Sequence, residues 1–376
     1  MSKSVTSSPP ESLRDVVLAG PGAGVGAHVV GAAPLAVVVK PGQVRAAAAT
    51  VGHTDSRRTA LTGAATTVLV LGLCLFFGEG APTVLARLWP HLVAFNPVTA
   101  FGGPVTAAAL SQARARLPAA VLRAVFEAGA QLADACPQIL GLRVFGLVVT
   151  ATDGTVFDAP AADGVAERFA TPSGGRFPQV RVVTLVVCGT RRVLAAVLDS
   201  CAVSEQALWD RLVEQLRPGT LNLADRNFFS MARWLAASAT GAQLAWRVKN
   251  GHHSLPATVI RTLPDGSQLL RLRESDAMLA LRRARTGDRK APRFPDTVTR
   301  LVEFRVTTTD QAGASTTSRF RVLTTLLDHV AHPAAEVAAC YAQRWQVELT
   351  YKTMKSTLRG PGRRLRGESA NLVEQE

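Results

Sequence analysis

The stretch "LRVFGLVVTATDG", from Leu142 to Gly154, decides the fold class of this chain. It is apolar and rich in β-branched residues, and it closes on Asp153-Gly154, a pair typical of turns. The pattern predicts a buried strand that ends at Asp153. Two more strand candidates follow it, "FPQVRVVTLVVCG" at 177–189 and "RRVLAAVLDS" at 191–200.

The next segments alternate between helix and strand patterns. "SEQALWDRLVEQL" at 204–216 predicts a helix with Ser204 as its N-cap and Glu205 in its first turn. "PGTLNLAD" predicts a strand that ends on Asp225, and "NFFSMARWLAAS" predicts another helix. The order of three strands, helix, strand and helix predicts an α/β fold. Asp153 and Asp225 then both end strands, where open α/β sheets place their sites.

The flanking regions follow other patterns. The chain is helical in character from about Arg57 to Ala135, whereas 243–328 is β-rich, with hairpins about "PDG" and "DQAG". The cationic run "LRRARTGDRKAPR" lies between the hairpins. We therefore expect five segments: a flexible or irregular N-terminal segment at 1–50, a helical domain at 51–137, the first part of the α/β core at 138–242, a β-rich insertion at 243–330, and a helix with the C-terminus at 331–376.

Composition favours a polyanionic partner. The 376 residues include 42 Lys and Arg against 28 Asp and Glu, a net charge of +14, which suits nucleic acid or a membrane surface. The five Cys show no CxxC spacing, so we expect neither a disulfide framework nor a zinc site, and a reducing cytoplasm fits. The uncharged run at 61–77 is shorter than the about twenty residues of a membrane span, so it predicts a buried helix.

A helix predicted at 336–358 carries "YAQRWQVELTYKTMK". At about 100° per residue, Tyr341, Arg344, Glu348 and Lys355 fall within an arc of roughly 60°. A neighbouring stripe is spaced for burial and comprises Cys340, Val347, Tyr351, Met354 and Leu358. One interpretation of the polar arc is a solvated face on which Arg344 pairs with Glu348 at i,i+4.

The other interpretation is a metal site. Asp153, Asp225 and Glu348 are three hard oxygen donors of the kind that Mg²⁺ prefers. Two such ions activate the attacking oxygen and stabilise the leaving oxygen of an in-line phosphoryl transfer. Arg344 and Lys355 would then meet DNA phosphates, and Tyr341 would stack on a base or donate to a phosphate. Ordinary alternatives stay open, with Asp153 in a plain turn and Asp225 capping the next helix.

The sequence resembles a known family at these residues. "YAQRWQVELTYKTMK" fits Y-(2)-R-(3)-E-(6)-K without a gap, the signature of bacterial DDE transposases of the insertion element four group. "TATDGTVFDAP" resembles the family's first-aspartate block, and "LNLADRNFFS" resembles its second, including Arg226. "RRTALTGAATTVLVLGLCLFFGEGAPTVLARL" and "ALSQARARL" look like the group's N-terminal helical domain. The resemblance covers about residues 50 to 366, and the first fifty residues lie outside it.

The resemblance implies an RNase H-like catalytic core with a β-rich insertion before the glutamate helix. It also implies two Mg²⁺ ions, with Mn²⁺ as a substitute, and a homodimer that pairs two transposon ends. The partner would be double-stranded DNA at terminal inverted repeats, with no membrane, and the bound protein would associate with the nucleoid. The site residues would be Asp153, Asp225 and Glu348 for catalysis and metal binding, and Tyr341, Arg344, Lys355, Arg226, Arg282, Arg283 and Arg285 for DNA binding.

The polar ending "RGPGRRLRGESANLVEQE" follows soon after the signature, where relatives continue with further helices, so we expect a truncated copy. Two functions are therefore open. The first is a metal-dependent transposase that cleaves and joins DNA. The second is a catalytically incomplete remnant that binds transposon ends. A third class, a membrane protein anchored by residues 61–77, is distinguished by its need for detergent.

Overall fold

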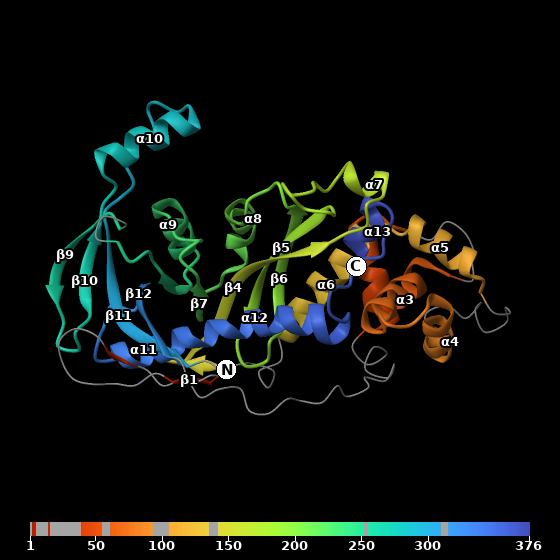
Figure 1. Ribbon diagram of the computed structural model, residues 1–376, viewed down its shortest axis with the longest axis horizontal. Helices are drawn as coiled ribbons and strands as arrows, with labels where there is room; N and C mark the ends of the chain where they lie inside the picture. Colours follow the sequence, from red (N-terminus) through yellow and green to blue (C-terminus); the bar gives the residue numbers. More distant parts are fainter. Residues whose placement is uncertain are drawn as a thin grey trace.

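The computed structural model describes residues 2–4, 14–15, 39–54, 61–92, 105–134, 142–251, 255–309 and 315–376. Figure 1 shows a row of three regions: N-terminal helices at one end, a mixed sheet with helices in the middle, and a β-rich region at the other end. Most of the segment expected to be irregular at 1–50, and the turn "DQAG", lie outside the described residues.

The central sheet has an α/β arrangement, as expected. Its strands follow the spatial order β6-β5-β4-β7-β8. β4, β7 and β8 are parallel, while β5 is antiparallel to both of its neighbours. This order, 3-2-1-4-5 with the second strand reversed, is the RNase H-like arrangement. The bounds are β4 Leu147–Asp158, β5 Gln179–Val187, β6 Val193–Ser200, β7 Thr220–Ala224 and β8 Gln243–Arg247, and the short β3, Arg143–Val144, pairs with β4.

β4 is longer than the sequence pattern predicts. Asp153-Gly154 was expected to form a turn, but the strand runs on to Asp158 and stays paired with β5 as far as Asp158↔Gln179. Thr155, Val156 and Phe157 favour an extended chain, and β5 supplies hydrogen-bond partners for their backbone. The parallel pairing with β7, by contrast, stops at Thr152↔Ala224. Asp153 therefore lies where β4 loses its parallel neighbour.

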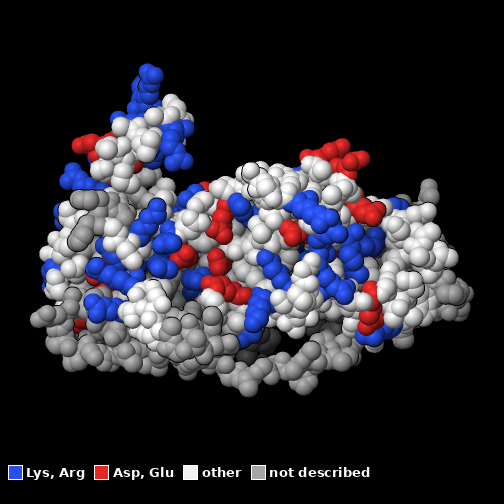
Figure 2. Space-filling view, in the orientation of Figure 1, with Lys and Arg blue, Asp and Glu red and all other residues white. Residues whose placement is uncertain are grey.

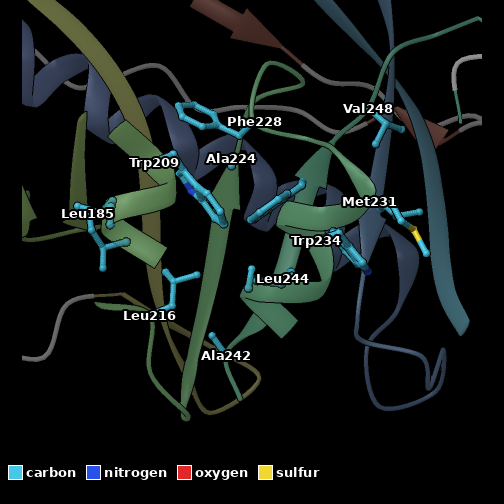
Figure 3. Close-up of a cluster of buried hydrophobic side chains, with 14 of the residues drawn as sticks. Leu185, Trp209, Leu216, Ala224, Phe228, Met231, Trp234, Ala242, Leu244 and Val248 are labelled. Atoms are coloured by element: carbon cyan, nitrogen blue, oxygen red, sulfur yellow. The ribbon is translucent and has the colours of Figure 1, made fainter. Parts of the chain in front are cut away.

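Two helices cover one face of the sheet, α8 at Glu205–Leu212 and α9 at Met231–Ala239. The Ser204 side chain accepts the Ala207 N–H and caps α8, as predicted. Trp209, Trp234 and Trp246 pack edge to face beneath the helices, with ring centroids 5.2 and 5.6 Å apart. Figure 3 shows Trp209 and Trp234 among the buried side chains of this layer. Edge-to-face aromatic packing of this kind rigidifies the strands that lead to the site.

A helical run covers the opposite face, close to the helix predicted at 336–358. It comprises α11 (Ala334–Tyr341), a 3₁₀ turn η4 (Ala342–Arg344), α12 (Trp345–Lys352) and a π-helical segment η5 (Thr353–Leu358). Buried side chains of this run pack on β4 and β7, namely Val337, Tyr341, Val347 and Tyr351 against Val149, Ala151, Leu221 and Leu223. The changes of helix type alter the angular phase of the residues that follow.

The β-rich region continues the same sheet, because β12 pairs antiparallel with β8. The strand β8 was placed in the insertion from sequence, but its parallel pairing with β7 makes it the fifth strand of the core. The remaining elements are β9 Ala257–Thr262, β10 Gln268–Leu272, α10 Asp276–Thr286, β11 Thr297–Thr309 and β12 Ser315–Thr324, with β1 (Ser2–Ser4) and β2 (Arg14–Asp15) paired to β11. The cationic run begins on α10, which stands off the body in Figure 1.

A buried ion pair joins the β-rich region to the start of the helical run. The fully buried Arg300 donates to Asp265 Oδ2 at 2.5 Å and to the His332 main-chain oxygen at 2.6 Å. The same Asp265 oxygen accepts the Ala334 N–H at 2.9 Å, at the first residue of α11. The "PDG" turn, which the sequence predicted as a hairpin, thus fixes where the helical run begins.

The N-terminal region is helical, but its first helix was missed. α2, Pro41–Thr50, lies inside the segment predicted to be irregular. Pro41 sits in the first turn, and the Gln43 side chain accepts the Lys40 N–H at 3.2 Å, so the alanine-rich run begins a helix that packs on α6. The other helices are η3 (Val213–Gln215) and α7 (Asp163–Ala166) in the core, and α3 Gly63–Leu75, α4 Ala81–Leu92, α5 Ala107–Arg116, α6 Ala119–Asp134 and α13 Ala370–Gln375.

α3 is buried on nearly all sides, as predicted for the apolar run. Across the described ranges, no helix combines the length and apolar character needed to cross a membrane. α13 joins the C-terminal residues to the N-terminal helices: Asn371 and Gln375 bond to main-chain groups of residues 114–119, which close α5 and open α6.

Candidate active site

Asp153 and Asp225 lie next to each other at the edge where β4 and β7 separate. The last paired residues are Thr152 and Ala224, so the two aspartates are the next residues on adjacent parallel strands. Both follow residues that face the helical run, Ala151 and Leu223, and the strand period of two places them on that face too. Burial raises the pKa of Asp153, and the charge of Asp225 raises it further, against the opposing influence of Arg344 and the Gly154 N–H.

Arg344 links the first aspartate to the helical glutamate. One guanidinium nitrogen lies 3.1 Å from Asp153 Oδ2 and another lies 2.5 Å from Glu348 Oε1. The pair between Arg344 and Glu348 is the i,i+4 contact that the sequence allowed. Its extension to Asp153 was not foreseen, and it brings together two acids 195 positions apart in the chain. The side chain of Arg344 is only 17% exposed, so the contact is screened little by solvent.

Asp225 is less completely paired. Its Oδ1 is 3.6 Å from Arg247 and has no hydrogen-bond partner although it is buried. Arg247 is held over the Phe320 ring, with its guanidinium carbon 3.9 Å from the ring centroid. The prediction that Asp225 caps the next helix is wrong, because Ser230 caps α9. The carboxylate oxygens of Asp225 are therefore not used to cap the helix.

Two tyrosine hydroxyls fasten the helical run to the strand ends. Tyr351 donates to the main-chain oxygen of Asp153 at 2.6 Å and meets the Thr184 hydroxyl at 2.7 Å. Tyr341 donates to the main-chain oxygen of Ala224, just before Asp225, at 3.3 Å. The predicted contact of Tyr341 with a base or phosphate is not compatible with this structure, because the side chain is buried among Phe304, Phe320 and the sheet.

A buried polar network supports the strands from the other face. Asn222 on β7 donates to the Thr152 hydroxyl at 2.9 Å and accepts the Trp246 indole N–H at 2.9 Å. Its members belong to β4, β7 and β8, and all three side chains are fully buried. A satisfied buried network fixes the relative register of its strands. The network therefore positions Thr152, directly before Asp153, and Asn222, three residues before Asp225.

The predicted DNA-binding cations are dispersed. Arg226 is exposed beside Asp225, and Lys355 is half-buried with its ammonium 5.1 Å from the Phe157 ring centroid. Arg282 is paired with Glu274 at 2.7 Å, and Arg283 donates to the Ala291 oxygen at 2.9 Å, so both brace the loop after α10. Arg285 is exposed on α10. α10 projects away from the central sheet in Figure 1.

Sequence reasoning missed one acid beside the site. Glu205, the first residue of α8, lies against Gly154: a Cβ added there would be 1.8 Å from its Oε1. Burial raises the pKa of Glu205, and the charges of Asp153 and Asp225 add to the effect. The sequence had explained Glu205 by the helix dipole alone. A glycine directly after a strand-end aspartate was the signal that something else approaches the backbone there.

Acidic side chains gather near the middle of the face shown in Figure 2, with Lys and Arg on both sides of them. Within the described ranges, no three His, Cys, Asp or Glu side chains are arranged to hold a metal ion. The acids present are Asp153 within β4, Asp225 directly after β7 and Glu348 on α12, and arginines contact all three.

Comparisons with known proteins agree with this architecture. Residues 145–375 match the transposase DDE domain, and residues 30–127 match the insertion element 4 transposase N-terminal domain. The second match starts at residue 30, so the expectation that the first fifty residues lie outside the family is wrong in part.

The chain is 28% identical over 278 residues to the transposase InsG for insertion sequence element IS4 of Escherichia coli strain K12. That match covers 72% of this chain and 58% of the relative, so it spans little more than half of that protein. A cryo-EM structure of the piggyBac transposase synaptic complex with hairpin DNA aligns with a TM-score of 0.40 at 9% identity, over 93% of this chain and 73% of that one. Because the DDE-domain match alone spans more than half of the sequence, the chain belongs to the DDE transposase family, with an N-terminal domain of the insertion element 4 type.

Proposed function

We propose that this chain is the DNA transposase of an insertion sequence and that it catalyses metal-dependent cleavage and strand transfer at transposon ends. The observation that carries the proposal is the placement of three acids from distant parts of the chain. Asp153 lies on β4 where its parallel pairing with β7 ends, Asp225 follows β7, and Glu348 reaches Asp153 through Arg344. Family membership supports the same class of reaction.

The proposed metal ligands are Asp153, Asp225 and Glu348. Carboxylate oxygens are the donors that Mg²⁺ prefers, and the buried Oδ1 of Asp225 has no hydrogen-bond partner among the described residues. Two facing carboxylates, one of them with an orphaned oxygen, suit a cation, so the donor set fits. We propose two Mg²⁺ ions with Mn²⁺ as a substitute. Bound there, such ions activate the attacking oxygen and stabilise the leaving oxygen of an in-line phosphoryl transfer.

Arg344 has a second task in this proposal. Its guanidinium pairs with the carboxylates of both Asp153 and Glu348. A metal cation bound to these carboxylates would compete with the guanidinium. A planar guanidinium also binds phosphate oxygens in pairs. We propose that Arg344 exchanges its carboxylate partners for a DNA phosphate when the ligands take up metal. The tyrosine hydroxyls hold the backbone of the strand ends in place during that exchange.

The proposed partner is double-stranded DNA at terminal inverted repeats. Arg226 and Lys355 flank the acids and are candidates for phosphate contacts, and Arg285 is exposed for a more distant contact. Arg282 and Arg283 have internal partners, so we assign them a structural role instead. The segment boundaries expected from sequence stay our proposal, with α2 added to the helical domain and β8 to the core. A homodimer that pairs two ends, and association with the nucleoid, belong to the same proposal.

One observation favours the alternative, a DNA-binding remnant that occupies transposon ends without cleaving them. The oxygens expected to bind metal are engaged by Arg344 at both Asp153 and Glu348. A chain in which that contact never opens would bind DNA and stay inactive.

The deciding experiment incubates the full chain with a duplex that carries the ends of its parent element. We expect nicks at the element boundary in Mg²⁺ or Mn²⁺ and none in EDTA. If the chain shifts the duplex on a gel but never nicks it with either ion, the remnant is the correct function. A chain that neither binds nor nicks this duplex contradicts both.

A further inference from the structure

Glu205 reaches the acidic site from the opposite side of the sheet. It begins α8, which covers the face away from the helical run that carries Glu348. Its carboxylate lies against the backbone of Gly154, where a Cβ would be 1.8 Å from Oε1 and 2.7 Å from Cδ. The absence of a side chain at residue 154 is therefore what allows this carboxylate to lie against β4 at the residue next to Asp153.

The carboxylate of Glu205 is tethered by a neighbour of the second aspartate. Asn227, two residues after Asp225, donates its amide to Glu205 Oε2 at 2.8 Å. Gln206 in turn donates to the Asn227 main-chain oxygen at 3.1 Å and to its side-chain oxygen at 3.2 Å. The tether fixes the side chain from the loop after β7 through Oε2, and Oε1 is the oxygen nearer to Gly154.

No cation reaches Glu205 by direct contact among the described residues. Arg181, which lines the same open cavity of about 390 Å³, donates to the Val203 oxygen at 2.7 Å instead. Arg344 pairs with Asp153 and Glu348, and Arg247 pairs with Asp225. Glu205 is thus a fourth acid near the edge where β4 and β7 separate, close enough to interact with the charges of Asp153 and Asp225, and Arg181 acts on it only through its charge.

We propose that Glu205 is a fourth carboxylate of the metal site, which binds the divalent cation held by Asp153 and Asp225 either directly or through one of its waters. This inference rests on the proposed function, since it assumes that the aspartates bind metal. Mg²⁺ keeps several waters in protein sites, so a carboxylate one water away still contributes to its affinity. Gly154 is needed for this arrangement, because any side chain at residue 154 would displace the Glu205 carboxylate.

The test measures Mn²⁺ binding to the full chain by isothermal titration calorimetry, without DNA. Glu205→Gln keeps the shape of the side chain and removes its charge, and we expect it to weaken Mn²⁺ binding about tenfold or more, the scale of a lost supporting ligand. Glu205→Asp keeps a carboxylate and should recover part of the loss. Glu214→Gln, at an exposed position just after the same helix, is the matched control and should bind as wild type does.

Asp153→Asn separates this inference from the proposed function. If Asp153→Asn loses Mn²⁺ binding while Glu205→Gln matches Glu214→Gln, the aspartates bind metal and Glu205 does not, so the inference alone is overturned. If wild type does not bind Mn²⁺, or Asp153→Asn binds as wild type does, the proposed metal site is wrong and the inference falls with it.

Circular dichroism of each variant checks that it folds. Should Glu205→Gln not fold, Asn227→Ala decides, since it removes the tether and keeps all four acids: a weakened affinity supports the proposal and an unchanged one overturns it.

Discussion

The hydroxyl of Tyr351 lies 2.6 Å from the main-chain oxygen of Asp153 and so joins the helix that carries Glu348 to the strand that carries the first aspartate. The Thr184 hydroxyl forms a second hydrogen bond with the same tyrosine oxygen, at 2.7 Å. The second tyrosine of the chain, Tyr341, makes a longer bond of 3.3 Å beside Asp225. The relative position of the three acids therefore depends on two phenol groups that touch no acid side chain.

This relationship predicts unequal effects for two equivalent substitutions. Tyr351→Phe should lower the free energy of unfolding by about 1–3 kcal/mol, because it leaves a buried carbonyl and a hydroxyl without their partner. Tyr341→Phe should cost less, since its bond is longer and single. Urea denaturation of both variants gives the comparison. A larger loss for Tyr341→Phe than for Tyr351→Phe would contradict the assigned roles.

A second prediction concerns the buried Arg300, which fixes the first residue of α11 through Asp265. Arg300→Met should lower the free energy of unfolding by about 3–5 kcal/mol, because it leaves a carboxylate and two carbonyls without their cation. The control is Arg273→Ala, which removes a distant surface pair with Asp296 at 3.9 Å and should cost less than about 1 kcal/mol. Equal losses in the two variants would show that Arg300 does not hold the helical run.

The third prediction follows from the raised pKa values of Asp153 and Glu205, both due first to burial. A carboxyl group with a higher pKa in the folded state binds its proton more tightly there, so the free energy of unfolding falls as pH rises from its unfolded pKa of about 4 through the folded value. Without divalent ions, Asp153→Asn and Glu205→Gln should therefore melt above wild type at pH 7. The difference should vanish below about pH 4.

Differential scanning fluorimetry across this pH range checks the sign. The opposing influence is the ion pair with Arg344, which favours ionised Asp153. If Asp153→Asn melts below wild type at pH 7 and the two converge in acid, the ion pair outweighs burial and the sign is wrong.

The fourth prediction is a strong dependence of DNA binding on salt, as the net charge of +14 and the basic surface of Figure 2 indicate. Contacts with six or more phosphates should weaken binding about a thousandfold between 50 and 200 mM salt. Arg285→Ala should reduce the slope by about one phosphate contact, whereas Arg282→Ala, whose guanidinium is paired with Glu274, should reduce it less. Fluorescence anisotropy with a labelled duplex measures both, and a flat salt response would exclude phosphate-dominated binding.

The core of this fold was predictable because its signals are local. The apolar and β-branched residues at 142–154 predicted β4, and the pattern at 218–225 predicted β7. Ser204, as an N-cap residue, predicted the start of α8. The extent of β4 beyond Asp153 was not predictable, since it depends on hydrogen bonds to β5 that only the tertiary structure supplies. α2 was missed because its alanine-rich sequence has little periodicity, although Pro41 in its first turn and Gln43, which accepts the Lys40 N–H, mark the start.

The acids of the site could be proposed from strand ends and a spacing motif, but not their partners. A uniform 100° period placed Tyr341 beside Arg344 on a polar face, whereas the tyrosine packs in the core and a 3₁₀ turn separates the two helices. The bond from Arg344 to Asp153 and the approach of Glu205 to Gly154 join residues far apart in sequence. Such contacts follow from the strand order, which a single sequence leaves open.

The most direct test of the central claim, that Asp153, Asp225 and Glu348 perform metal-dependent DNA cleavage, compares wild type with Glu348→Gln on one duplex carrying the ends of the parent element. Glutamine keeps the size of the side chain and can still accept from Arg344, but it lacks the charge that a metal ligand needs. We predict that Glu348→Gln shifts the duplex on a gel as wild type does and nicks it at least a hundredfold more slowly in Mg²⁺, an amount of about 2.7 kcal/mol in the activation free energy. Equal nicking rates in the two proteins would contradict the account.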